Sequence, residues 1–178
     1  MQLKLNAVRL AFPSVYEAKA IKAGDDPAYS ATFIFGHKHE AAAAVEAAIE
    51  QVATEKWGTK TKDILKAIRT KGDVCLHNGD EKAQYDGFEG NLYVSARSKS
   101  RPTVIDKDKT PLTLADGKPY GGCYVNAILD IWAQDNNFGK RVNASLSGIQ
   151  FVADGESFGG ARPARVDDFD VVEEESLV

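Results

Sequence analysis

The sequence has little of what several protein classes require. Its 178 residues include only two cysteines, Cys75 and Cys123. Two cysteines in apolar, strand-like surroundings make no disulfide framework, so we expect both to be reduced and structural. No apolar run reaches the roughly 18 to 20 residues of a membrane helix, and the alternating N-terminus is unlike a signal-peptide core. These absences predict a cytoplasmic protein without a membrane partner.

Signatures of catalysis and metal binding are also sparse. The chain has no Walker-type phosphate loop and no nucleophile elbow. Two pairs of potential metal ligands, His37 with His39 and Cys75 with His77, are each separated by a single residue. This spacing is closer than the two to four intervening residues of structural zinc motifs. Paired acids such as Asp25-Asp26 fall in turn-like segments, where solvated carboxylates are more common than nuclease ligands. We therefore expect no catalytic residue, no metal and no cofactor, so the protein is not predicted to be an enzyme.

The acidic residues are concentrated at the C-terminal end. The chain has 26 acidic residues against 22 lysines and arginines, a formal net charge of −4. Six of the acids, and no base, fall within residues 167–178; the remaining 20 acids against 22 bases give residues 1–166 a net charge of about +2. We expect a folded body over residues 1–154, a linker over 155–166 and a disordered acidic tail over 167–178.

Hydrophobic periodicity predicts a β-rich fold with inserted helices. Strands are expected at residues 3–10, 29–35, 91–98, 122–133 and 140–152. The first loses its alternation near Val8, as a bulged strand does, and Pro13 is expected to end it. Apolar residues at helical spacing predict helices over 40–56 and 61–70. This order predicts an α+β, mainly β fold: an OB-like antiparallel barrel with one or two inserted helices.

The segment 91–101 separates into two faces because strand side chains alternate. Leu92, Val94 and Ala96 form an apolar face. The opposite face carries Tyr93, Ser95, Arg97, Lys99 and Arg101. Cations neutralise phosphates, and a flat ring stacks on a base at ~1–3 kcal/mol. This face favours binding of single-stranded DNA, with an ordinary solvated strand face as the alternative.

The next long strand has one wholly apolar face. That face consists of Cys123, Val125, Ala127, Leu129 and Ile131 and should point to the core. On the other face, Tyr124 and Trp132 either stack on bases or cover a second layer under a loop or helix. A hairpin follows, in which an exposed Phe138 with Lys140 and Arg141 could clamp a flexible strand.

Four segments in a fixed order support a family resemblance. They are Arg9-Leu10-Ala11-Phe12-Pro13 with Tyr16, Tyr29-Ser30-Ala31-Thr32-Phe33, Tyr120-Gly121-Gly122-Cys123-Tyr124-Val125, and Val152-Ala153-Asp154-Gly155-Glu156 followed by Phe158-Gly159-Gly160. Together with the acidic tail, they resemble the phage single-stranded DNA-binding proteins, a family once catalogued only as a domain of unknown function. The resemblance implies an OB fold with a helical insertion, sequence-independent binding, and a role in phage DNA replication or recombination in the host cytoplasm.

The tail is the expected partner-binding segment. Its acidic and aromatic residues are Asp167, Asp168, Phe169, Asp170, Glu173, Glu174 and Glu175. A mobile polyanion can occupy a cationic DNA groove and be released to replication or recombination proteins when DNA displaces it. Tails of this kind are otherwise only solubilising. The chain ends in Leu177-Val178, unlike the aromatic or Pro-Phe termini of functionally similar proteins, so the resemblance does not identify the partner.

Sequence analysis thus predicts a non-enzymatic protein that protects single-stranded DNA, as a homo-oligomer or a cooperative array. Two alternatives remain open at this stage. One is a recombination mediator or strand-annealing protein. The other is a protein-interaction module whose acidic tail mimics DNA.

Overall fold

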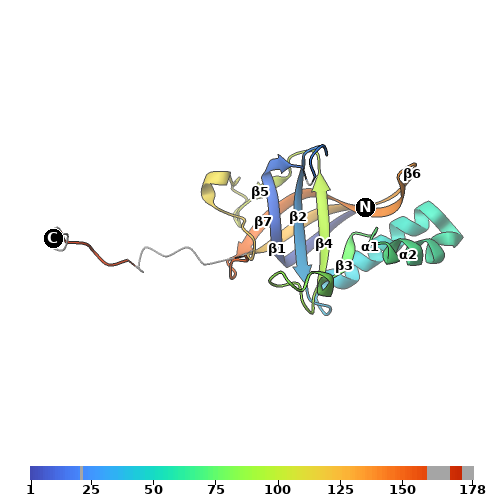
Figure 1. Cartoon of the computed structure of the whole chain (residues 1–178), viewed down its shortest axis with the longest axis horizontal. Coiled ribbons are helices and arrows are strands. Elements are labelled where there is room, and N and C mark those ends of the chain that lie inside the picture. Colours follow the sequence, from blue (N-terminus) through green and yellow to red (C-terminus); the bar gives the residue numbers. More distant parts are fainter. Residues whose placement is uncertain (21, 160–168, 174–178) are drawn as a thin grey trace.

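Five strands close into a barrel in the computed structural model, which describes residues 1–20, 22–159 and 169–173 (Figure 1). These strands are β1 (Gln2–Lys19), β2 (Ala28–Phe35), β4 (Leu92–Ser98), β6 (Tyr124–Asn136) and β7 (Gly139–Ala153). Their order is β4-β2-β1-β6-β7, and a parallel bridge between Arg97 of β4 and Ser145 of β7 closes the ring. The short strands β3 (Leu76–Asn78) and β5 (Thr103–Ile105) add to β4 and β7. The predicted OB-like barrel is confirmed.

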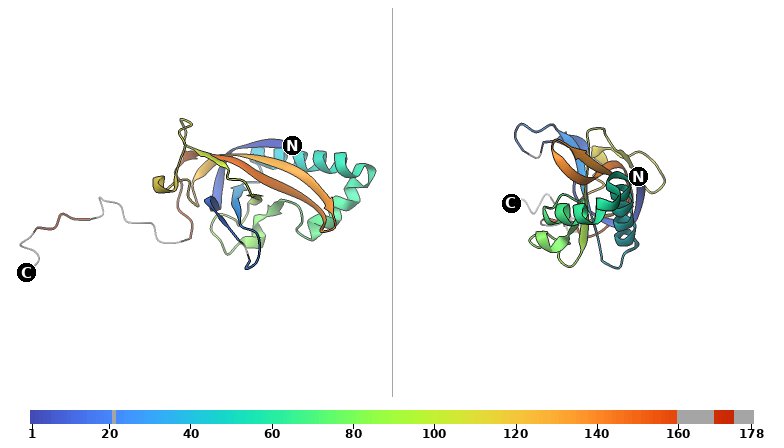
Figure 2. Two further views of the ribbon diagram at one scale, coloured as in Figure 1. Left: turned by 90° about the horizontal axis from the view of Figure 1, so that it is seen from above. Right: turned by 90° about the vertical axis from the view of Figure 1, so that its right-hand side faces the viewer.

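Two helices lie between β2 and β3, as predicted. Helix α1 (Glu40–Trp57) begins after His39, whose Nδ1 accepts a hydrogen bond from the backbone N of Ala41 at 3.0 Å. A short 3₁₀ turn, η1 (Gly58–Lys60), leads into α2 (Thr61–Thr70). Helix α1 packs its buried side chains against the barrel, and both helices lie at the end toward which the β6–β7 hairpin reaches (Figure 2). In the described part of the chain, no helix is both long and apolar enough to cross a membrane.

Strand β1 has three register shifts, and only the first was predicted. Its register with β6 shifts between Leu5 and Val8, which confirms the expected bulge. Its register with β2 shifts between Ala11 and Ser14 and again between Ser14 and Lys19, and β1 continues to Lys19 instead of ending at Pro13. Proline lacks a backbone donor but is tolerated at a bulge, where the hydrogen-bond ladder is already interrupted.

The barrel core follows the predicted inner face of β6. Cys123, Val125, Ala127, Leu129 and Ile131 are all 0% exposed. A smaller cluster of Ala11, Ile34, Phe88 and Tyr93 forms outside the barrel, where the segment after β3 covers β2 and β4.

The folded body extends beyond the expected boundary at residue 154. The backbone N of Gly155 donates to the hydroxyl of Tyr120 at 3.2 Å. The backbone N of Phe158 donates to the carbonyl of Gly121 at 3.0 Å, and its ring packs on the smaller cluster. Residues 155–159 therefore contact the barrel, whereas the rest of the expected linker lies outside the described residues.

Candidate nucleic-acid interface

A groove lies over the seam where β4 and β7 close the barrel. Its volume is about 840 Å³. We call it the barrel groove; the residues used in the argument are His77, Ser95, Arg97, Lys99, Trp132, Gln134, Arg141, Asn143 and Ser145. Asp25 and Asp26, from the turn between β1 and β2, line one edge. Strands far apart in the sequence thus contribute to one surface.

Trp132 supplies a partly exposed ring to the barrel groove. Its side chain is 40% exposed, and its Nε1 donates a hydrogen bond to Oγ of Ser145 at 2.9 Å. Because the polar edge is bonded to the neighbouring strand, the orientation of the indole is constrained. An oriented, partly exposed ring can stack on a base of any identity.

Three cations line the same groove. Arg97 makes no ion pair with any of the described residues, so its guanidinium is available to an anion. Nζ of Lys99 lies 3.6 Å from Asp26, and both side chains are more than four-fifths exposed. Nη1 of Arg141 donates to Oδ1 of Asp73 at 2.7 Å. The Lys99–Asp26 pair is exposed, and exposed pairs contribute little stability, so Lys99 can exchange this carboxylate for a phosphate.

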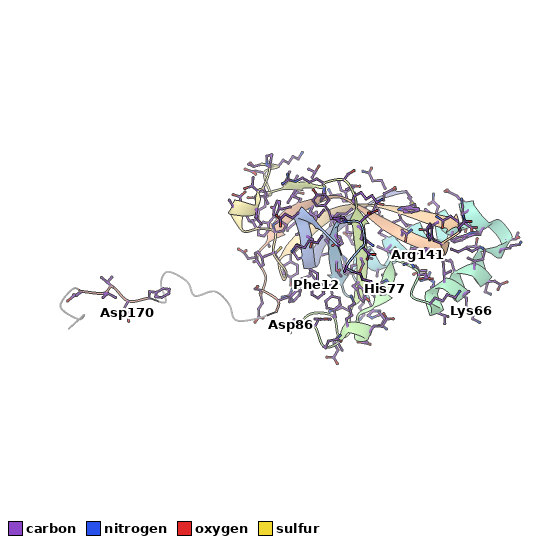
Figure 3. The ribbon with its side chains drawn as sticks, turned by 45° about the horizontal axis from the view of Figure 1, so that its top comes forward. Phe12, Lys66, His77, Asp86, Arg141 and Asp170 are labelled. Carbon is purple, nitrogen blue, oxygen red and sulfur yellow. The ribbon has the colours of Figure 1, made fainter. Side chains whose placement is uncertain are left out.

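Uncharged polar groups fill the space between the cations. Nδ2 of Asn143 donates to Oε1 of Gln134 at 2.9 Å across β6 and β7. His77 stacks on Tyr93 with ring centroids 4.9 Å apart. Burial lowers the pKa of His77 below its ordinary value, so its neutral form predominates at neutral pH. In Figure 3, His77 and Arg141 lie near each other on the side of the barrel that carries this groove.

Four of the nine predicted DNA-contacting residues meet in the groove: Arg97, Lys99, Trp132 and Arg141. Tyr93 does not, although it shares a strand face with Arg97. Its side chain is only 4% exposed because Phe88 packs edge-on against its ring at 5.2 Å. The expectation that Tyr93 is an open stacking platform is wrong.

The other predicted residues lie elsewhere. Arg101 lines a separate depression beside Tyr16 and β5. Tyr124 is 37% exposed, but it starts β6, at the opposite end of that strand's outward face from Trp132, and lies near Arg9. Phe138 and Lys140 are at the tip of the β6–β7 hairpin, where Lys140 pairs with Asp135 at 3.7 Å.

Sequence reasoning identified Arg141 but missed Asn143 and Ser145, which share its face of β7. Arg141, Asn143 and Ser145 alternate with the buried Val142, Ala144 and Leu146. The strand was predicted, and its period-two pattern was the available signal. His77 was not predictable in this way, because a three-residue strand is too short to show periodicity.

The tail is described only at residues 169–173. Phe169 is 72% exposed, and Asp170 and Glu173 are exposed. The predicted partner-binding residues Asp167, Asp168, Glu174 and Glu175 lie outside the described residues. Among the described residues, no group of three or more His, Cys, Asp or Glu side chains could hold a metal ion.

Comparisons with known proteins place this geometry in context. The family model described as Enterobacter phage Enc34, ssDNA-binding protein, matches residues 1–178. The chain is 45% identical over 186 residues to putative protein p50 of Acyrthosiphon pisum secondary endosymbiont phage 1, covering 100% of this chain and 99% of that protein. It is 25% identical to the single-stranded DNA-binding protein from bacteriophage Enc34 solved in complex with ssDNA, with a TM-score of 0.75 over 89% of each chain. It shares the fold of gp2.5, a single-stranded DNA-binding protein encoded by bacteriophage T7, with 16% identity, a TM-score of 0.57 and coverage of 98% and 96%.

Proposed function

The chain belongs to the family of the Enterobacter phage Enc34 ssDNA-binding protein, and from that premise we propose that it binds single-stranded DNA along the barrel groove during phage DNA replication. One observation carries the proposal. The groove combines an oriented, partly exposed Trp132 with Arg97, Lys99 and Arg141. This is the combination of stacking ring and phosphate-neutralising cations that single-strand binding requires.

The proposed mode of binding is independent of sequence. Guanidinium and ammonium groups bind phosphates, which every nucleotide carries, and an indole ring stacks on any base. Gln134, Asn143 and Ser145 supply further hydrogen-bonding groups beside the ring. Bound strands would be shielded from nucleases and from reannealing in the host cytoplasm, where phage DNA is copied.

We propose that binding occurs without catalysis. The groove presents cations, amides and an aromatic ring, which suit a binding surface. Among the carboxylates at the groove, Asp26 pairs with Lys99, Asp73 accepts a hydrogen bond from Arg141, and Asp25 lies in an exposed turn.

We propose that the acidic tail competes with DNA for the same cations and, once displaced, binds replication or recombination proteins. The body of the chain is mildly basic and the tail holds six acids, so their attraction is strongest at low salt. A variant that keeps the chain length tests this competition. It carries Asp→Asn at positions 167, 168 and 170 and Glu→Gln at positions 173, 174 and 175.

Fluorescence anisotropy of a labelled oligo(dT) tests the function. We expect the natural protein to bind at low salt and to lose affinity as salt rises. The neutral-tail variant should bind more tightly, with the gain shrinking at moderate salt. Absence of binding by both proteins at low salt would contradict the proposed function, while equal binding by both would contradict only the competing tail.

A further inference from the structure

A second concave surface, which we call the aromatic pocket, lies beside the segment that follows β3. It has a volume of about 340 Å³, and its ring-bearing walls are Phe12, Tyr85, Phe88 and Phe158. Phe12 is 51% exposed and Tyr85 is 46% exposed, and their rings meet edge-on at 5.2 Å. Apolar surface gathered in a concave site marks a binding site more often than scattered apolar residues do.

The backbone of Phe12 has an unusual conformation. Its φ is 48°, in the left-handed region that bulky residues rarely adopt. Phe12 lies within the register shift between Ala11 and Ser14, where the pairing of β1 with β2 is interrupted. Strained conformations persist where the surrounding structure enforces them, and they gather at ligand-binding sites. The strain at Phe12 therefore supports a binding role for its exposed ring.

Two cations lie on the rings of the aromatic pocket. Nζ of Lys82 lies over the rings of Phe12 and Phe88, 6.0 Å from each centroid. Cζ of Arg9 lies over the ring of Phe158. Within the part of the chain that the structure describes, Lys82 makes no ion pair. A ligand that combines a flat ring with a negative charge matches these groups, and each nucleotide of a DNA strand carries both.

The acidic residues nearby restrict where the phosphate can lie. The segment 79–90 has four acids, and of these Asp86 lines the pocket itself. The carboxylate of Asp80 is turned to its own loop, where Oδ1 accepts a hydrogen bond from the backbone N of Gly90 at 2.8 Å. A phosphate is repelled by Asp86 and attracted by Lys82. We therefore expect the phosphate beside Lys82 and the uncharged base in the pocket.

A row of rings connects the aromatic pocket with the barrel groove. Ring centroids are 5.9 Å apart from Phe12 to Phe88 and 5.2 Å apart from Phe88 to Tyr93. Tyr93 then stacks on His77 at 4.9 Å, and His77 lines the groove (Phe12 and His77 are labelled in Figure 3). Nζ of Lys82 lies over this row as well, 5.1 Å from the centroid of Tyr93. The pocket and the groove are therefore neighbouring parts of one surface.

We propose that the DNA strand continues from the barrel groove across this row and places one base in the aromatic pocket. The base stacks on the exposed ring of Phe12 beside Tyr85, and its phosphate lies at Lys82. This inference rests on the proposed function, because the same strand must occupy the groove. It adds a base-binding position separate from Trp132 and lengthens the stretch of strand that one copy covers.

A series of oligo(dT) lengths, measured by fluorescence anisotropy with the full-length protein, tests the pocket. The comparison uses only lengths at which native mass spectrometry shows one copy bound. The affinity of the natural protein should rise as the strand fills the groove and rise again, by about tenfold, when it reaches the pocket. Phe12→Asn and Tyr85→Ser should bind the shorter strands as the natural protein does and lose most of this second gain.

Two choices make the variants specific. Asparagine is used at position 12 because it adopts the left-handed backbone more readily than other side chains do. Phe138→Ser is the matched control: it removes a ring that is 91% exposed at the hairpin tip, outside both concave surfaces, and should keep the second gain. Natural affinity for the shorter strands also shows that each variant is folded.

Lys82→Gln distinguishes a phosphate contact from a structural role. On strands that reach the pocket, this variant should reduce the slope of log affinity against log salt by about 1. On the shorter strands the slope should stay as in the natural protein. An unchanged slope on the longer strands would contradict a path over Lys82.

Crosslinking tests the path without any change to the protein. Strands that carry a single 5-bromodeoxyuridine at successive positions are irradiated with the natural protein, and the crosslinked peptides are identified by mass spectrometry. Some positions should crosslink to Trp132 or His77 in the groove, and positions nearer one end should crosslink to Phe12 or Tyr85. Crosslinks to the groove alone, from every position, would overturn the inference.

The outcomes separate this inference from the function on which it rests. If the natural protein binds no oligo(dT) of any length at low salt, the proposed function is contradicted. If it binds, but Phe12→Asn and Tyr85→Ser keep the full second gain, the pocket holds no base and only the inference fails. The inference also fails if these variants weaken the shorter strands as much as the longer ones. An effect confined to complexes of two copies would assign the pocket to a contact between copies and overturn it as well.

Discussion

Trp132 and Tyr124 occupy the same outward face of β6 and have nearly equal exposure, 40% and 37%, but only Trp132 lines the barrel groove. This pair separates the effect of the groove from that of an exposed ring in general. Trp132→Ala should weaken binding of oligo(dT) by roughly tenfold, within the ~1–3 kcal/mol that stacking contributes per base. Tyr124→Ala should change it little. Equal losses in an anisotropy titration would show that the groove is not the DNA path.

Arg97 and Arg101 form a second matched pair. Both are arginines near the end of β4, but Arg97 lines the barrel groove and Arg101 lies beside β5. Arg97→Gln should weaken binding and reduce the slope of log affinity against log salt by about 1, since one phosphate contact is lost. Arg101→Gln should leave the slope unchanged. Titrations at four or more salt concentrations measure both slopes, and an unchanged slope for Arg97→Gln would contradict the assignment.

At the scale of elements, the segment 155–159 acts as part of the body. Arg9 joins it to β1: its Cζ lies 4.3 Å from the centroid of the Phe158 ring, and its Nη2 donates to the carbonyl of Glu156 at 2.8 Å. Phe158→Ala should lower the free energy of unfolding by about 1–2 kcal/mol, because the ring is partly buried. Phe169→Ala, which alters an exposed ring in the tail, should have no measurable effect. The urea concentration at the midpoint of unfolding is measured for the natural protein and both variants. A midpoint for Phe158→Ala equal to that of the natural protein would mean that the segment does not stabilise the fold.

The elements also show what sequence periodicity can predict. The inner face of β6 was predicted because five apolar residues alternate without interruption. The burial of Tyr93 was not, since it depends on Phe88 in a segment without periodicity. The groove was predicted only in part, because its two sides meet where Arg97 pairs with Ser145, a long-range contact that no local pattern encodes.

For the molecule as a whole, the two buried thiols give stability a defined pH dependence. Burial raises the pKa of Cys75 to about 12 and that of Cys123 to about 11, from an ordinary value of 9.0. The folded state therefore holds these protons more tightly than the unfolded chain. The resulting stabilisation is complete below pH 9 and is lost as the pH rises through the folded values.

Chemical unfolding between about pH 8 and 10.5 measures this loss. The natural protein should become steadily less stable above about pH 9. A variant with Cys75→Ala and Cys123→Ala should start from lower stability, because each change leaves a cavity, but decline less steeply. Burial also raises the pKa of Tyr16, Tyr93 and Tyr120, so part of the decline should remain. An identical slope of the free energy of unfolding against pH in both proteins would contradict the role of the thiols.

The central claim is that single-stranded DNA lies in the barrel groove. Photocrosslinking of the full-length protein to an oligonucleotide containing 5-bromodeoxyuridine, followed by mass spectrometry of the crosslinked peptides, tests it most directly. We predict crosslinks at Trp132 or at His77, the aromatic side chains that line the groove. Crosslinks confined to Phe12, Tyr85 or Tyr124, with none in the groove, would contradict the account.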